Sequence, residues 1–149
     1  FSPINGVPQP PGVAAPQEDG TWTLFYNFDQ MLVANPNDPE QGWGVFGRFG
    51  IADYKSSAIH TFTSLGLGGT GLIPGRDRDR SGLGAYYMTF ADERVELILP
   101  KDEEYGMELY YTMEVTPWFQ CTADIQVVEG ALRGADTAVI GAVRGRLSF

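Results

Sequence analysis

The feature that most restricts the fold of this chain is a strict alternation of side chains over residues 104–115, EYGMELYYTMEV. Large apolar or aromatic side chains occupy one set of alternate positions: Tyr105, Met107, Leu109, Tyr111, Met113 and Val115. The positions between them are polar or small: Glu104, Gly106, Glu108, Tyr110, Thr112 and Glu114. A strand places successive side chains on opposite faces, whereas an amphipathic helix repeats about every 3.6 residues. The segment therefore predicts one long strand with an apolar face and a polar face.

Similar alternation recurs from Thr21 to the end of the chain. The predicted strands are residues 21–33, 42–53, 59–69, 81–91, 104–115, 118–128 and 136–149. Each has about the length of ten residues that a tilted membrane strand needs. Glycine is frequent in 59–69 and 81–91, so the pattern does not assign their faces. The chain is thus predicted to be all-β, with about seven antiparallel strands in an up-and-down meander and short turns at 35–41, 74–81 and 115–118.

Charge and composition exclude several classes of protein. The formal net charge of −9 at pH 7 argues against nucleic-acid binding, because phosphate contacts need a basic surface. No apolar run reaches the roughly 18 residues of a transmembrane helix. The single Cys121 offers neither a disulfide pair nor a cysteine cluster for zinc. We expect no metal and no cofactor. Residues 1–20 are rich in Pro and Gly without periodicity, which predicts a loop preceding a strand region over 21–149.

Two environments are compatible with alternating strands, and the residues alone leave both open. One is a membrane barrel, favoured by aromatic residues near predicted strand ends, such as Trp22, Trp118 and Phe119. The other is a soluble carbohydrate-binding β-sandwich, or a glycoside-active enzyme built on one. The two differ in whether the Tyr105/Leu109/Tyr111/Met113 face is exposed to lipid or covered by a second sheet.

Four motifs that could carry other chemistry have simpler explanations. Residues 66–71 satisfy GxGxxG, but no helix follows, so we interpret these glycines as places where a strand bends. Residues 77–82 imitate half of a calcium loop, yet Met88 stands where a Glu is needed, so a self-paired charged turn is preferred. Asp29, Glu108 and Asp124 could supply the two carboxyl groups of a glycosidase, but no other catalytic motif accompanies them. The lone His60 is interpreted as a strand or rim residue.

Three stretches resemble the C-terminal half of the OprB-like carbohydrate-selective porin family. They are the strand GWGVFGRFG at 42–50, the turn PGRDRD at 74–79, and the block that contains ELYY at 108–111 and TPW at 116–118. The resemblance covers nearly everything from Trp22 to Phe149. It implies a transmembrane β-barrel of about sixteen strands in the bacterial outer membrane, through which carbohydrates diffuse passively without enzymatic catalysis.

The same resemblance carries expectations about partners. About seven strands cannot close such a barrel, so the chain is expected to be its C-terminal portion, completed by the remaining N-terminal strands of the parent. Outer-membrane lipid would surround it, and the terminal Phe149 would be read by the barrel-assembly machinery. If Phe149 lies on the periplasmic side, the predicted short turns face the periplasm and residues 1–20 belong to an extracellular loop.

The candidate substrate-binding residues are polar side chains predicted to face the lumen. Monosaccharides and oligosaccharides are neutral polyols with apolar ring faces, so weak binding needs paired donors, acceptors and aromatic rings. The residues that supply these groups are Arg48, Glu108, Tyr110, Asp124, Gln126, Arg144 and Arg146. No catalytic residue is predicted.

Overall fold

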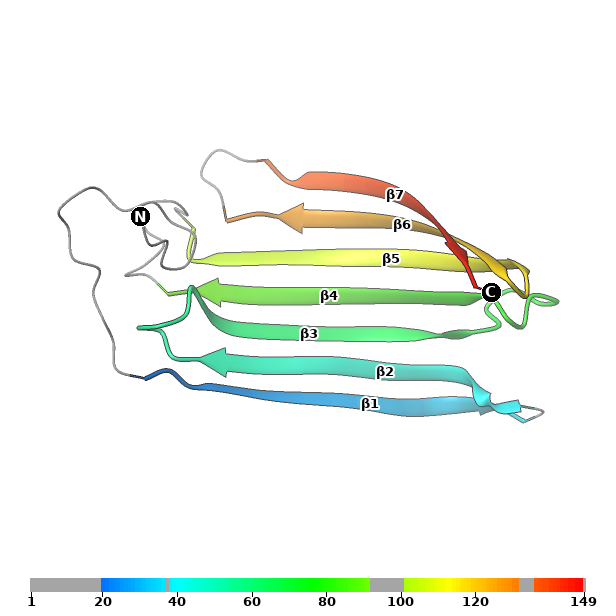
Figure 1. Ribbon diagram of the computed structural model, residues 1–149, viewed down its shortest axis with the longest axis horizontal. Helices are drawn as coiled ribbons and strands as arrows, with labels where there is room; N and C mark the ends of the chain where they lie inside the picture. The colour runs from blue at the N-terminus through cyan, green and yellow to red at the C-terminus, as the bar shows by residue number, and fades with distance from the viewer. Residues whose placement is uncertain (1–19, 37, 92–100, 132–135, 149) are drawn as a thin grey trace.

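The structure is a computed structural model that describes residues 20–36, 38–91, 101–131 and 136–148. Regular structure in these ranges consists of seven strands: β1 (Thr23–Asn35), β2 (Asp38–Ala52), β3 (Ile59–Thr70), β4 (Arg80–Phe90), β5 (Glu103–Thr116), β6 (Phe119–Glu129) and β7 (Ala138–Leu147). They form one sheet in the order β1 to β7, and every neighbouring pair is antiparallel (Figure 1). The predicted up-and-down all-β meander is confirmed. In the described ranges, no helix has the length and apolar character needed to cross a membrane.

The strand boundaries differ from the predicted ones mainly at the first turn. β2 begins at Asp38, and Asn35 is paired with Asp38 across the β1–β2 turn. The predicted polar turn over 35–41 is therefore too long, since residues 38–41 belong to β2, where the side-chain nitrogen of Gln41 donates to Asp38 at 2.8 Å. Residues 1–19 and Phe149, on which the predicted loop and the assembly signal rest, lie outside the described residues.

Glycine and proline shape the other two turns at this end of the sheet. The β3–β4 turn contains Gly71 and Gly75, whose φ angles of 71° and 81° lie in the left-handed region that favours glycine. The β5–β6 turn is closed by Pro117 and Trp118, as predicted. We call this end, which carries the β1–β2, β3–β4 and β5–β6 turns, the turn end of the sheet; it lies on the right in Figure 1.

The strand register divides the side chains between an apolar face and a polar face. The apolar face continues the predicted face of β5: Leu109 is opposite Leu83 on β4 and Ile125 on β6. The polar face includes Glu108, which is opposite Gly84 and Gln126. The register also shows which side chains of the two glycine-rich strands lie on each face. On β3 and β4 the apolar face carries Thr63, Leu65, Leu67, Leu83, Ala85 and Tyr87, and the polar face carries Phe62, Ser64, Gly66, Gly82, Gly84 and Tyr86.

The apolar face is exposed across the sheet. Tyr105 is 49% exposed, Leu109 53% and Val143 78%. Ala52, Ala91 and Ala131 are the only buried hydrophobic residues among those described, so this part of the chain has no conventional core. A soluble sandwich would need a second sheet over this face. Its exposure argues against that alternative and fits a face that meets lipid.

From β3 to β6 the polar face is more enclosed than the apolar face, although no second layer covers either one in the described residues. Along β5 the side chains of Glu104, Glu108 and Tyr110 are half-buried, whereas Met107 and Leu109 between them are exposed. In a single sheet this difference arises when long side chains on one face lie against their neighbours. Such crowding is expected on the inner side of a curved sheet, where the lumen of a barrel would lie.

Candidate functional site: a hollow on the polar face

All seven predicted lumen residues lie on the polar face, but they do not form one cluster. Four are direct or diagonal neighbours on β5 and β6, because Tyr110 is opposite Asp124 and Glu108 is opposite Gln126. On β7, Arg144 is opposite Thr122 and Arg146 is opposite Gln120, so both arginines lie toward the turn end. Arg48 is separate. It lies on β2, where its Nε donates to the side-chain oxygen of Asn27 on β1 at 2.8 Å.

Asp124 is the most enclosed member of this set. Its side chain is almost completely buried, and the amide nitrogen of Gln126 donates to its Oδ1 at 3.3 Å. Its Oδ2 accepts no hydrogen bond from the described residues and lies 3.8 Å from a guanidinium nitrogen of Arg144. The Arg144 side chain is 72% exposed. Arg144 therefore compensates the buried carboxylate from its solvent side, at the length of an ion pair rather than of a hydrogen bond.

A hollow of about 270 Å³ lies beside this pair on the polar face. Its aromatic lining is Phe46, Phe62, Tyr86 and Tyr110, its polar lining includes Ser64, Glu108 and Gln126, and Gly84 also lines it. Three of the predicted residues, Glu108, Tyr110 and Gln126, thus line the hollow. The combination of ring faces with a carboxylate and an amide suits a small solute that has both an apolar face and hydroxyl groups.

The aromatic rings of the hollow are held in place by contacts within the sheet. Tyr86 stacks on Phe62, with ring centroids 6.2 Å apart and planes inclined by 16°. The hydroxyl of Tyr86 donates to Glu104 at 2.9 Å. Tyr86 therefore has both its ring and its hydroxyl positioned before any solute arrives.

Phe46, Phe62 and Tyr86 were not among the predicted site residues. The sequence did contain a signal for Phe46, since it lies two residues from Arg48 and strand alternation places both on one face. Phe62 and Tyr86 lie on the two strands whose faces the sequence pattern did not assign. Their faces became clear only from the pairing of Phe62 with Met88 and of Tyr86 with Gly106.

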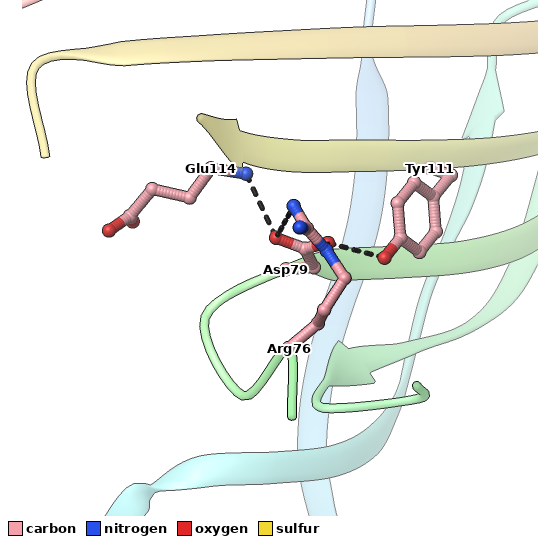
Figure 2. A network of polar contacts seen from close by, with 4 residues as sticks. All are labelled: Arg76, Asp79, Tyr111 and Glu114. Carbon is pink, nitrogen blue, oxygen red and sulfur yellow. Dashed lines mark hydrogen bonds and ion pairs between the residues drawn. The ribbon is translucent and has the colours of Figure 1, made fainter. Parts of the chain in front are cut away.

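A second polar cluster fastens the β3–β4 turn to β5 at the turn end (Figure 2). Asp79 is 3% exposed, and its carboxylate accepts hydrogen bonds from Arg76, from the hydroxyl of Tyr111 and from the backbone N–H of Glu114, the last at 2.9 Å. Burial by itself would raise the pKa of Asp79. The donors from Arg76, Tyr111 and Glu114 outweigh it and hold that pKa below its ordinary value.

The charged turn is self-paired only in part. Arg76 pairs with Asp79 inside the turn, and this partner raises the pKa of Arg76. Arg78 instead reaches out of the turn to Glu114 on β5, at 3.0 Å. Among the described residues no group of three or more His, Cys, Asp or Glu side chains is arranged to hold a metal ion.

The structure also shows where the other motifs noted in the sequence lie. Gly66 to Gly69 lie inside β3, as expected for a strand rather than a dinucleotide loop. The ring Nδ1 of His60 lies 2.9 Å from the carbonyl oxygen of Ala52, beside the β2–β3 turn, which fits a rim residue. Asp29 on β1 is separated from Glu108 on β5 by three intervening strands, so the sheet does not place them as neighbours.

Known proteins resemble nearly the whole of this chain in sequence and in fold. The model of the family described as "Carbohydrate-selective porin, OprB family" matches residues 3–149. The chain belongs to this family. Porin B of Pseudomonas aeruginosa is 22% identical over 150 residues, which cover 87% of this chain and 32% of that protein. The solved high-pH structure of Pseudomonas putida OprB matches with a TM-score of 0.76 at 22% identity, over 84% of this chain and 34% of that one.

Membership in the OprB family confirms the resemblance inferred from the sequence and places the chain in the bacterial outer membrane. The fold match identifies the seven-stranded sheet with part of an outer-membrane barrel. The chain spans about a third of the length of the relatives it matches. A family of porins also favours a channel over an enzyme.

Proposed function

We propose that this OprB-family chain forms part of the wall of an outer-membrane channel for passive diffusion of carbohydrates. The observation that carries the proposal is the hollow on the polar face, where four aromatic rings stand beside Glu108 and Gln126. A sugar can stack its apolar ring face on an aromatic side chain while its hydroxyl groups bond to a carboxylate or an amide. Both groups are half-exposed, so binding stays weak enough for release.

The wider set of predicted lumen residues has a supporting role in this proposal. Arg48, Asp124, Arg144 and Arg146 share the polar face with the hollow but do not line it. We infer that they keep the lumen wall wet and contact solute during its passage. The exposed apolar face would meet lipid, and the strands beyond β1 and β7 would come from the rest of the barrel. We further propose that Phe149 is recognised by the assembly machinery and that the channel performs no catalysis.

Solute flux tests this function directly. The full-length protein in liposomes is expected to admit glucose and maltose faster than zwitterionic amino acids of similar size, because the hollow offers ring faces and hydrogen-bond partners rather than a charged clamp. The measurement is the swelling rate after addition of each solute, with protein-free liposomes as the control. Equal rates for sugars and amino acids would contradict sugar selectivity, and no flux of either would contradict a channel.

A further inference from the structure

Three aromatic rings on the polar face each lie over a glycine on the neighbouring strand. The pairs are Phe46 over Gly66, Tyr110 over Gly82, and Tyr86 over Gly106, and in each the two residues are direct partners in the strand register. A Cβ atom on Gly82 would lie 2.7 Å from Cε1 of Tyr110, and one on Gly106 would lie 2.6 Å from Cε1 of Tyr86. A Cβ on Gly66 would lie 2.6 Å from Cε2 of Phe46.

At these distances a methyl group at the glycine position and the neighbouring ring cannot both keep their places. Real Cβ atoms essentially never come within 3.0 Å of another heavy atom in this way. Each ring therefore folds sideways across the sheet into space that a methyl group would fill. With alanine at the partner position, the ring would have to lift away from the sheet and into the hollow.

The rings of Phe46 and Tyr110 approach one another over the glycines between them. A Cβ on Gly68 would be 3.4 Å from Cε1 of Phe46 and 3.4 Å from the hydroxyl oxygen of Tyr110. One ring comes from β2 and the other from β5, so together they span the glycine-rich β3 and β4. We call the rings of Phe46, Tyr86 and Tyr110 the ring platform. All three line the hollow beside Glu108 and Gln126.

We propose that Gly66, Gly82 and Gly106 are specificity-determining positions, which hold the ring platform flat so that ring faces are presented to a cyclic sugar. The inference rests on the proposed carbohydrate function and adds to it a preference for one class of solute over another. A pyranose has a flat apolar face that can stack on such a platform, whereas an acyclic polyol has the same hydroxyl groups but no such face. The platform then favours cyclic sugars over acyclic polyols.

The test is a double-mutant cycle in the full-length protein reconstituted in planar bilayers. The variants are Gly82→Ala, Tyr110→Ala and the double variant, and the readout is the solute concentration that half-blocks the ion current, for maltose and for sorbitol. We expect Gly82→Ala to raise that concentration for maltose about three- to tenfold, the range of one lost aromatic contact. The half-blocking concentration of sorbitol should change little. In the Tyr110→Ala background, Gly82→Ala should raise the half-blocking concentration of maltose little further, because the glycine acts through the Tyr110 ring.

The matched control is Gly50→Ala on β2, also on the polar face but outside the hollow. A Cβ there would meet its nearest atoms at 3.9 Å, an ordinary contact, so wild-type block by maltose is expected. If Gly82→Ala fails to form channels, the same cycle is run with Gly106→Ala and Tyr86→Ala. Two results would overturn this inference but leave the proposed function standing, provided that maltose blocks the wild type. One is a half-blocking maltose concentration that the glycine variant does not change. The other is a glycine effect that is equally large with and without the tyrosine ring. No block by maltose in the wild type would overturn the proposed function with it.

Discussion

Gly42→Ala is expected to destabilise the sheet by more than about 3 kcal/mol or to prevent refolding. Gly42 is on β2 next to the bulged part of the β1–β2 pairing, with a φ of 153°. A Cβ there would collide with the carbonyl oxygen of Val33 and lie 2.9 Å from Cα of Ala34. Both are backbone atoms of β1, so relief requires moving the strand rather than turning a side chain.

The measurement is the folded fraction of full-length protein in detergent across a urea series, scored by the faster migration of folded barrels in unheated gels. Gly50→Ala on the same strand is the control, since its Cβ would have no contact closer than 3.9 Å. We expect its urea midpoint to stay close to wild type. Equal midpoints for the two variants would contradict the close approach of β1 and β2 at Gly42.

Asp79→Ala is expected to lower the free energy of unfolding by about 3 kcal/mol, since hydrogen bonds to a charged group contribute about 1.5–3 kcal/mol each and are not additive. Removal of the carboxylate leaves the hydroxyl of Tyr111 and the backbone N–H of Glu114 without their acceptor. It also leaves Arg76 without its partner in the turn. Urea unfolding of the full-length protein measures the change.

Asp77→Ala is the matched control, because Asp77 is an exposed carboxylate in the same turn. We expect a change within about 0.5 kcal/mol, as for most surface substitutions. A loss as large as that of Asp79→Ala would show that net charge in the turn, rather than the bonds of Asp79, stabilises it.

The contribution of Asp79 should depend on pH in the direction set by its lowered pKa. A carboxyl whose pKa is lower in the folded state stabilises that state fully above the unfolded pKa of about 3.9. As the pH falls from there through the folded pKa, the carboxylate is protonated and the contribution is lost. The stability gap between wild type and Asp79→Ala should thus be constant from about pH 7 to 5 and shrink below about pH 4. A gap that persists unchanged at pH 2 would contradict the charged network.

The strand pattern was predictable because one physical rule governs it. The alternation through Glu108, Leu109 and Tyr110 gave the length of β5, its two faces and the pairing of those faces with β6. The same rule placed all seven candidate residues on one face. It could not show that Asp124 is buried or that Arg48 stands apart, because those facts depend on which strands are neighbours and how far each is shifted.

The aromatic lining of the hollow was missed for a related reason. Aromatic residues near the ends of a membrane strand are expected to contact the membrane interface, and Trp22 and Trp118 are exposed next to strand ends. Phe62 and Tyr86 are instead on the polar face. Nothing in the sequence of a glycine-rich strand fixes its register, and a shift of one residue would exchange its two faces. Burial of Asp79 likewise depends on β5, which lies more than 20 residues further along the chain.

Cysteine labelling of two adjacent positions tests most directly whether the polar face lines a sugar path. In a Cys121→Ala background, Glu108→Cys would place a thiol in the hollow and Leu109→Cys one on the apolar face. In membranes containing the full-length protein, a membrane-impermeant thiol reagent should modify Cys at 108 rapidly, and maltose should slow that reaction. The same reagent should leave Cys at 109 unmodified. Rapid modification at 109, or a rate at 108 that maltose does not change, would contradict this account.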